Sequence, residues 1–424
     1  MLNLNENRKA TPIILFRSLV GFNTRLVRYM MPLFLIFLDW NEYMYALLFS
    51  VAGYLATGAI IGLGYITDVK KRKYTMIIGI GISSLSMVLF YIASNYEIKG
   101  WMIAAYSLFG VSGQLVQLSL TTLMADITST KKEKTRFFGY MAFFWNMTGV
   151  VAPLLGGAFL ILFNRFQSSK QSYQTLLLFV AAFLFITMLL AFKFPIPEQT
   201  KDQASIISKG EEWKNFEDKD KKPIRVQLVA FFVCEAIMGF TSGIAVPFIS
   251  FHIITTFKTS DFIWGIILAG SNAGIALGSL LMVRLSKVFG NEKALAALHF
   301  LAPVLALGIT LGTLLPVVST FFVIRSSAVN MSRPSWQSFF YGWLPPKYRG
   351  TSTGFVSAGR RLTRALGTNA GGFFYTVLGA WIFPLAMLGY PVAIMIPIVV
   401  QLFLKKRFKQ EDEIQPILSS EEDI

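Results

Sequence analysis

The sequence predicts an all-α membrane protein with twelve transmembrane helices, arranged as two parallel six-helix repeats. Three observations lead to this fold class. Hydrophobic residues make up 54% of the 424 residues and charged residues only 15%, whereas a typical soluble domain has about 25% charged residues. Uncharged stretches such as 43–67 and 74–96 are long enough to cross a bilayer, which takes about 20 helical residues. The third observation is an internal repeat, described below.

Hydropathy divides the chain into twelve spans. They are expected at residues 12–38, 44–67, 74–95, 100–125, 137–163, 173–194, 225–254, 262–284, 294–312, 315–338, 351–378 and 381–404. The turn between the ninth and tenth spans is placed at Gly312 to Pro316, inside one uncharged run.

A polar segment divides the spans into two groups of six. Residues 195–223 are rich in Lys, Glu and Asp, so they are predicted to form a flexible linker because they cannot be buried. The predicted domains are a six-helix bundle at 1–194, the linker at 195–223, a second six-helix bundle at 224–404 and a cytoplasmic tail at 405–424.

Basic residues are distributed unequally between the two sides of this topology. If the N-terminus is cytoplasmic, the inner segments hold 28 of the 39 lysines and arginines, the outer loops four and the spans seven. Cytoplasmic loops are enriched in Lys and Arg, so both termini and the linker are predicted to lie in the cytoplasm, with the spans in the cell membrane. The net charge of +16 then reflects this sorting and does not indicate a nucleic-acid partner.

The composition excludes several classes of function. The single cysteine, Cys234, lies in an apolar run, and His252 and His299 have no acid or cysteine at ligand spacing, so neither a metal site nor a Ser-His-Asp enzyme is expected. A phosphate-binding pattern of the form G-x-x-x-x-G-K-[ST] is absent, which argues against an ATP-driven pump. We expect no enzyme and no cofactor, and a monomer whose partners are the lipid bilayer and a small-molecule substrate.

The two groups of spans repeat. Pro32 in the first span and Pro247 in the seventh are 215 residues apart. At the same offset, three glycines of the fifth span match three of the eleventh: Gly139, Gly156 and Gly157 correspond to Gly354, Gly371 and Gly372. Parallel repeats of this kind place a substrate site between the two halves, near the middle of the membrane.

The connection between the second and third spans carries a charged motif, G-Y-I-T-D-V-K-K-R-K, from Gly64 to Lys73. It resembles the cytoplasmic loop motif of the major facilitator superfamily, in which Gly64, Asp68, Arg72 and Lys73 match the expected residues. Lys71 stands where the family usually has a second glycine. The resemblance extends over all twelve spans, and it implies a transporter that works by alternating access.

The resemblance also implies a gate. In the family the aspartate of this loop caps the cytoplasmic start of the eleventh span, which is expected here near Gly350, where free backbone N–H groups favour a carboxylate. Asp126 at the end of the fourth span is expected to pair with Arg72 or Arg136. The alternative is a solvated loop whose charges serve only to orient the protein.

The fifth span contains a second motif, G-V-V-A-P-L-L-G-G, from Gly149 to Gly157. It is similar to a motif of drug–proton antiporters in the same superfamily, with matches at Pro153, Gly156 and Gly157. Ala152 and Thr148 stand where that motif has glycines. Small residues also let helices pack closely and proline bends a helix, so packing is the alternative explanation.

Seven of the arginines within the predicted spans are considered as candidates, and the other half has no basic residue at the corresponding positions. They are Arg17, Arg25 and Arg28 of the first span, Arg325 of the tenth, and Arg360, Arg361 and Arg364 of the eleventh. An arginine at the bilayer centre costs about 2.5–3.5 kcal/mol on the insertion scale, so such residues face the protein interior or water. Arginine forks suit carboxylate and phosphate groups. The alternative is hydrogen bonding to helix carbonyls and water.

Glu235 in the seventh span is the one acid within the spans. It is expected either to form a structural ion pair with one arginine or to carry protons, because burial and nearby arginines shift the pKa of a carboxylate in opposite directions. A single carboxylate cannot balance the remaining arginines. The predicted substrate-binding residues are Arg25, Arg28, Arg325, Arg361, Arg364, Asn23 and Gln117, with Glu235 as the proton-coupling residue.

We therefore predict a secondary active transporter of a small anionic organic or phosphate-like solute, coupled to protons. A multidrug efflux proton antiporter is the alternative suggested by the fifth-span motif. A membrane sensor that keeps the fold without transporting is a third hypothesis. The sequence does not specify the substrate, the direction of transport or the coupling ion.

Overall fold

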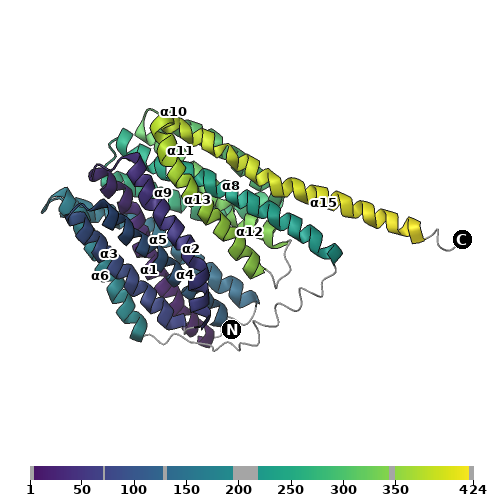
Figure 1. Ribbon diagram of the computed structural model, residues 1–424, viewed down its shortest axis with the longest axis horizontal. Coiled ribbons are helices and arrows are strands. Elements are labelled where there is room, and N and C mark those ends of the chain that lie inside the picture. The colour runs from purple at the N-terminus through teal and green to yellow at the C-terminus, as the bar shows by residue number, and fades with distance from the viewer. Residues whose placement is uncertain (1–3, 70–71, 128–130, 194–217, 343–348, 420–424) are drawn as a thin grey trace.

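The computed structural model describes residues 4–69, 72–127, 131–193, 218–342 and 349–419. Every regular element in these residues is helical. Figure 1 shows the helices as one bundle in which the start of the chain and the long last helix lie toward the same end. We call this the near end, where helices begin at Leu4 and Asp218. The opposite end, which holds the turns at 38–41, 96–98 and 257–260, is called the far end.

Six helices form the first half, and each contains one predicted span. They are α1 (Leu4–Phe37), α2 (Glu42–Val69), α3 (Arg72–Asn95), α4 (Lys99–Ile127), α5 (Lys131–Phe163) and α6 (Ser169–Lys193). The helices extend beyond the predicted spans mostly at the near end, because the polar residues there continue the helical backbone outside the apolar segment.

The second half follows the predicted order with two additional breaks. Its helices are α8 (Asp218–Thr256), α9 (Asp261–Phe289), α10 (Asn291–Leu311), α11 (Leu315–Met331), α12 (Arg333–Gly342), α13 (Arg349–Leu378), η2 (Gly379–Trp381), α14 (Ile382–Met387) and α15 (Gly389–Ser419). The turn expected at Gly312 to Pro316 is present between α10 and α11. Residues 218–223, which were assigned to the linker, are helical, and residues 194–217 lie outside the described residues.

The breaks in the tenth and twelfth spans both precede a proline. Helix α11 ends at Met331 and α12 begins at Arg333, and α14 ends at Met387 and α15 begins at Gly389. Pro334 and Pro391 lie within the first turn after each break. Proline has no N–H to donate to the carbonyl four residues earlier, so the hydrogen-bond ladder is interrupted at each point.

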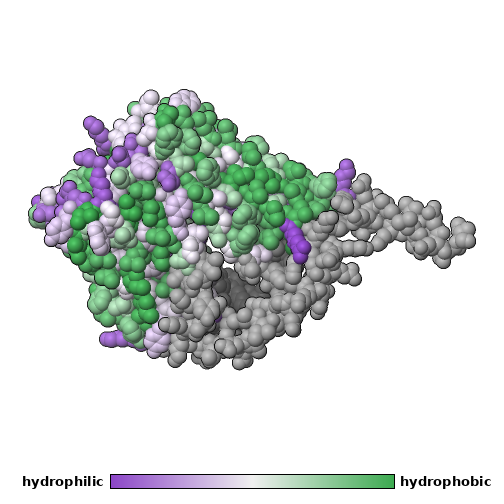
Figure 2. Space-filling model, viewed as in Figure 1, coloured by the Kyte–Doolittle hydropathy of each residue, from purple (hydrophilic) through white to green (hydrophobic). Residues whose placement is uncertain are grey.

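Apolar side chains cover the sides of the bundle. Large hydrophobic residues such as Ile186 on α6, Val304 on α10 and Leu402 on α15 are more than half exposed, and Figure 2 shows hydrophobic side chains over the visible flank of the described part. Soluble proteins rarely expose apolar patches of this extent. Eight segments of the described residues are long and apolar enough to cross a membrane, and the last, Ser352–Leu404, includes both α13 and α15. The predicted class, an all-helical multi-pass membrane protein, is confirmed.

The two halves repeat in their packing and in a turn. Helix α1 packs on α5 and α6, as α8 packs on α13 and α15. The turns that follow α1 and α8 both place a residue other than glycine in the left-handed region, Asp39 with φ 52° and Lys258 with φ 46°. In each turn the next N–H bonds to a carbonyl five residues earlier, Trp40 to Leu35 at 3.1 Å and Thr259 to Ile254 at 3.2 Å. This is the αL capping arrangement that ends many helices.

The halves meet along two pairs of helices, α5 with α9 and α2 with α13. Glycines allow the close approach. A Cβ at Gly265 of α9 would lie 2.6 Å from the carbonyl oxygen of Pro153, and one at Gly53 of α2 would lie 2.9 Å from the Ala365 Cβ. Nearer the far end, a Cβ at Gly372 of α13 would lie 2.8 Å from the Ala46 Cβ. Larger side chains at these positions would push the halves apart.

The contact between α2 and α13 is described only as far as residue 59 of α2, because the side chains of residues 60–69 lie outside the described part. Gly354 lies about three and five helical turns before Ala365 and Gly372, so the three residues share one face of α13. Gly354 is exposed, and a Cβ there would have no atom within 4 Å. Toward the near end α13 stays packed on α8, where Phe355 stacks on Phe232 with ring centres 4.7 Å apart.

Polar contacts join the halves at the far end. The Tyr173 hydroxyl of α6 donates to Asp261 Oδ1 of α9 at 2.7 Å, and the Tyr29 hydroxyl of α1 donates to the Asp261 carbonyl oxygen at 2.9 Å. Tyr45 of α2 donates to the carbonyl oxygen of Pro247 in α8 at 3.3 Å. The structure is thus closed at the far end.

Candidate functional site

Two arginines of α1 share one aromatic partner on α5. The guanidinium carbon of Arg17 lies 4.2 Å from the centre of the Trp145 ring and that of Arg25 lies 5.2 Å from it. Such cation–π contacts stabilise a charge without neutralising it, at about 0.5–2 kcal/mol each. The Arg25 Nε is buried without a hydrogen-bond partner in the described residues. Arg25 is therefore held beside Trp145 and keeps its full positive charge.

Arg28 and Arg364 face each other from opposite halves. Arg28 lies on α1 and Arg364 on α13, and each is close enough to interact with the charge of the other. Arg364 also interacts with the charges of Arg360 and Arg333. The side chains of Arg28, Arg364 and Arg333 are all exposed. These exposed guanidinium groups therefore come from three helices, α1, α12 and α13, and those of Arg28 and Arg333 lie within range of the charge of Arg364.

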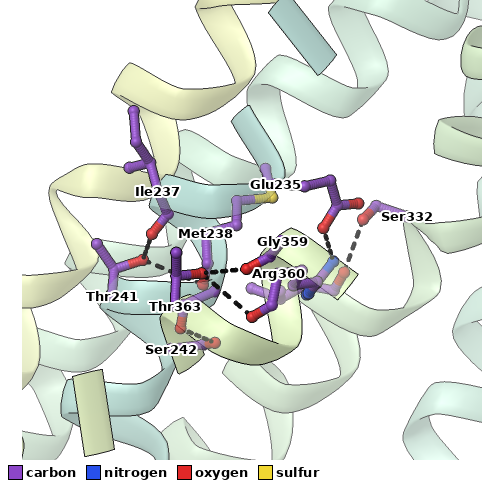
Figure 3. A network of polar contacts seen from close by, with 11 residues as sticks. Glu235, Ile237, Met238, Thr241, Ser242, Ser332, Gly359, Arg360 and Thr363 are labelled. Carbon is purple, nitrogen blue, oxygen red and sulfur yellow. Dashed lines mark hydrogen bonds and ion pairs between the residues drawn. The ribbon is translucent and has the colours of Figure 1, made fainter. Parts of the chain in front are cut away.

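Glu235 forms an ion pair with Arg360 within the second half. The Arg360 Nη1 lies 2.5 Å from Glu235 Oε2, and the two side chains are 24% and 7% exposed. Figure 3 shows that this pair joins α8 to α13 beside Ser332. Helix α13 also packs closely on α8 here, because a Cβ at Gly239 would lie 2.3 Å from the Arg360 carbonyl oxygen. Glu235 is thereby committed to one arginine and does not balance the others.

A small cavity lies next to this pair. It has a volume of about 20 Å³ and is lined by Glu235, Arg360, His299, Asn330 and Arg333, among other residues. This is room for about one water molecule. The His299 Nδ1 lies 2.7 Å from the Leu295 carbonyl oxygen, an acceptor that fixes the N–H on that nitrogen. The cavity can therefore hydrate the ion pair, but it is too small for an organic solute.

Arg361 reaches across to the other half. Its Nη1 donates a hydrogen bond to Oε1 of Gln114 on α4. Both side chains are half-buried. Gln114 and Arg361 each lie near the middle of their helices, Lys99–Ile127 and Arg349–Leu378, so the contact is at mid-depth. The sequence alone named Gln117 as a substrate residue one turn away, and it did not identify Gln114 as the partner of an arginine.

Arg325 is buried apart from this group. It is 3% exposed, its Nη2 donates to the Tyr390 hydroxyl at 3.3 Å, and its guanidinium carbon lies 5.9 Å from the centre of the Tyr390 ring. His299 also packs against that ring, with centroids 6.0 Å apart. These contacts enclose Arg325 inside the second half, whereas Arg28 and Arg364 are exposed.

The predicted amides differ in their surroundings. Asn23 is fully buried, and its Nδ2 donates to the Leu19 carbonyl oxygen of its own helix at 2.9 Å. Its Oδ1 has no partner in the described residues. Gln117 is half-buried on α4. The structure therefore places Asn23 in the packing of α1 and leaves Gln117 partly accessible.

Two of the predicted gate residues bind within the first half. Arg72 is 8% exposed and its Nη1 donates to the Thr122 carbonyl oxygen of α4 at 3.3 Å, and Lys73 Nζ donates to the Phe192 carbonyl oxygen of α6 at 3.3 Å. Both contacts tie the start of α3 to its neighbours. Four other residues predicted for the gate belong to helices, but their side chains lie outside the described part: Gly64, Asp68, Asp126 and Arg136.

The fifth-span motif lies at the contact between α5 and the other helices. A Cβ at Gly156 would lie 2.6 Å from Leu26 of α1, and one at Gly157 would lie 2.9 Å from the Phe262 Cα of α9. Pro153 is buried and its carbonyl oxygen faces Gly265. All three residues thus have packing contacts, as the alternative explanation of the motif requires.

The arrangement can bind an anion but does not suit a metal ion. Among the described residues no group of three His, Cys, Asp or Glu side chains could hold a metal. Exposed guanidinium groups from α1, α12 and α13 can donate paired hydrogen bonds to a carboxylate or phosphate. Three contributing residues carried little signal in the sequence. Trp145, Tyr390 and Gln114 are neutral, so no charge pattern marked them as partners of arginines.

Comparison with known proteins was made at three levels. The model of the Major Facilitator Superfamily matches residues 13–242 and 231–418. No curated protein sequence matches the chain.

Several solved structures share the fold at low sequence identity. A bacterial homologue of the human lysosomal transporter Spinster, inward-facing and unoccupied, has 12% identity and a TM-score of 0.68 over 95% of this chain and 97% of that one. The nucleoside transporter NupG has 14% identity and a TM-score of 0.64 over 94% and 99%. The transporter FucP in the outward conformation has 14% identity and a TM-score of 0.61 over 93% and 98%.

Proposed function

The chain belongs to the Major Facilitator Superfamily and is a secondary transporter in a membrane, and from this premise we propose that it carries a small anionic organic or phosphate-like solute. The observation that supports this substrate class is the pair of exposed arginines from opposite halves, Arg28 and Arg364. Glu235, the one acid within the predicted spans, is already paired with Arg360. An anion held between the halves would offset the repulsion between these two guanidinium groups.

The proposed cycle follows from the arrangement of the halves. With the termini in the cytoplasm, as the Lys and Arg distribution favours, the near end is the cytoplasmic end, and the halves are joined at the outer end by Tyr29, Tyr45 and Tyr173. The solute would enter between α1 and α13, and rocking of the halves would then open the far end. Arg28 and Arg364 belong to different halves, so a bound anion would hold them together during that movement.

Proton coupling is the second part of the proposal. Glu235 lies beside a cavity with room for about one water, so a proton has a short path to its carboxylate. Protonation would release Arg360, and the freed guanidinium would be available to the anion. Proton coupling predicts that a pH gradient drives uptake into proteoliposomes, and that this dependence on the gradient is lost in Glu235→Gln.

The substrate class is tested by binding and flux with arginine variants. We expect inorganic phosphate or organic anions such as succinate to raise the stability of the purified protein by about 2.7 kcal/mol at 100 times the dissociation constant. Arg28→Gln and Arg364→Gln should abolish this effect, and Arg28→Lys should weaken it, because lysine keeps the charge but not the fork. Arg17→Gln is the matched control, because Arg17 lies on the same helix as Arg28 but is stacked against Trp145 of α5.

The other hypotheses give different outcomes in the same experiments. A multidrug antiporter would be stabilised by lipophilic cations, and the two arginine variants would bind them at least as well as the wild type. A sensor would bind a ligand without any flux in proteoliposomes. If anion binding is unchanged in both Arg28→Gln and Arg364→Gln, the proposed anion site is wrong.

A further inference from the structure

The hydrogen bond between Arg361 and Gln114 is unusual among the contacts that join the halves. The tyrosine contacts to Asp261 and Pro247 lie at the far end. The bond from Arg361 to Gln114 instead lies near the middle of α13 and α4. Arg361 lies about one helical turn before Arg364 on α13, so a solute held between Arg28 and Arg364, as proposed above, would lie close to it.

The partner of Arg361 is neutral, and this makes the bond replaceable. An amide oxygen accepts one hydrogen bond from a guanidinium fork that can make two. The bond to Gln114 is already strengthened by the charge of Arg361, but a carboxylate or phosphate adds the attraction of an opposite charge and engages the fork at two points. Both side chains are half-buried, so a dissolved anion can reach them. A neutral solute gains no comparable advantage over Gln114.

We propose that Gln114 holds Arg361 in position across the substrate space and is displaced from it by the anion. The inference deepens the proposed function, on which it rests, by assigning a residue that makes the site selective for anions. In the empty carrier Gln114 keeps the Arg361 side chain extended toward the first half, so little side-chain freedom is lost when the anion binds. Displacement frees α4 from α13 and transfers Arg361 to the substrate.

The proposal fits the surrounding charges. Arg361 is close enough to Arg333 to interact with its charge, and Arg364 is close to Arg28 and Arg360. Placing a charged acceptor at position 114 would neutralise Arg361 permanently, whereas an amide orients it and leaves its charge available. The alternative is that this hydrogen bond is a fixed structural contact between α4 and α13, which persists when substrate is bound.

Two substitutions at Gln114 separate these possibilities because they have opposite expected effects. Gln114→Glu provides an acceptor that no anion can easily displace, and we expect it to weaken the binding of inorganic phosphate and of succinate at least about 10-fold. Gln114→Leu is similar in size and removes the competing acceptor, so we expect tighter binding, by up to about 10-fold, and a smaller preference for anions over neutral solutes. A fixed structural contact predicts weaker binding, or none, in both variants.

Thr121→Glu is the matched control. Thr121 is exposed and lies about two turns from Gln114 on the same face of α4. It places the same charge about 10 Å farther toward the near end, where the effect through water is about twofold. Dissociation constants of inorganic phosphate and succinate are measured by isothermal titration calorimetry on purified protein of each variant.

A second readout does not depend on a ligand. Spin labels at Tyr96→Cys and Lys258→Cys, in a Cys234→Ser background, report the separation of the halves at the far end. Gln114→Glu should increase the population of the short distance, since its carboxylate links α4 to Arg361 in the conformation closed at the far end. Gln114→Leu should decrease that population.

The possible failures can be told apart. If neither probe binds the wild type, the proposed anion function fails, and the displacement of Gln114 fails with it. If the wild type binds a probe while both Gln114 variants bind it within about twofold of the wild type, the anion function stands and the role of Gln114 is wrong. Weaker binding in Gln114→Leu with an unchanged distance distribution would likewise overturn the proposal.

Discussion

The ion pair between Glu235 and Arg360 gives the most direct test of the second half. Removing the carboxylate with Glu235→Gln leaves a buried guanidinium without its partner. Charges about 4 Å apart attract by about 4 kcal/mol at an effective dielectric constant of 20, and breaking a buried pair costs about 3–5 kcal/mol. Arg360 is 24% exposed and adjoins a cavity with room for about one water. We therefore expect a smaller loss, of about 2–3 kcal/mol.

Cys234 supplies the assay. It is the single cysteine of the sequence, is fully buried and directly precedes Glu235, so a thiol-reactive dye labels it only when α8 loosens. At about 2–4 °C per kcal/mol for a unit of 150–250 residues, the labelling midpoint of Glu235→Gln should fall by about 4–12 °C. Glu292→Gln is the matched control. Glu292 accepts from the neutral Gln401 at 3.2 Å, so an amide can replace it with little loss.

A double-mutant cycle completes this test. If the pair is ionised and structural, Glu235→Gln and Arg360→Gln together should cost less than the sum of the two single changes, by about 2 kcal/mol. A midpoint for Glu235→Gln within about 2 °C of the wild type, together with no coupling to Arg360, would refute the structural pair. That result would instead favour a carboxyl group that is protonated in the resting protein, for which glutamine is a close substitute.

Two further predictions concern the far end and the orientation. Tyr173→Phe removes the 2.7 Å hydrogen bond to Asp261, which is worth about 1.5–3 kcal/mol if the carboxylate is charged. The population of the long distance between the spin labels at positions 96 and 258 should therefore rise about 10-fold or more. This population should stay unchanged in the control Tyr91→Phe. In a Cys234→Ser background, an impermeant thiol reagent should label Lys258→Cys but not Gly210→Cys in intact cells. Labelling of Gly210→Cys would reverse the orientation, and with it the direction of the proposed cycle.

The helices were predictable from the sequence because their signal is local. Length and hydropathy located the twelve spans, and the narrow turn between α10 and α11 fell where the uncharged run contains Gly312 and Pro316. The two breaks near Pro334 and Pro391 were not predicted. Both lie within predicted spans, and hydropathy averaged over a span does not distinguish one long helix from two helices in series. The early start of α8 at Asp218 was missed because its first residues are charged and resemble a linker.

The partners of the arginines were less predictable, because they depend on how helices rotate and meet. Composition showed that one carboxylate serves several arginines, but it did not show that Glu235 selects Arg360. Arg325 and Arg28 lie at similar depths along their predicted spans, yet the Arg325 side chain points into the second half toward Tyr390. Gln114 meets Arg361 from a helix of the other half, a contact that no local pattern encodes. Neutral partners leave no charge pattern for sequence reasoning to detect.

The repeat explains why the positive charge is unequal between the halves. Trp145 of α5 and Arg360 of α13 occupy equivalent positions at the 215-residue offset, as do Arg17 of α1 and Phe232 of α8. In the first half the arginine stacks on the tryptophan and stays charged. In the second half Phe232 packs on α13, where a Cβ at Gly359 would lie 2.4 Å from its ring, and the arginine of that helix is paired with Glu235.

The exchange of aromatic and basic residues between these helices has a functional consequence. Cation–π contacts hold a guanidinium without cancelling its field, whereas the ion pair of Arg360 removes one positive charge from the second half. The first half therefore presents a charge that is constant, from Arg25 and Arg28. The second half presents a charge that changes by one unit when Glu235 gains a proton. If the carrier is proton-coupled as proposed, the first half would attract an anion with a fixed charge and the second half with a charge that depends on the protonation of Glu235.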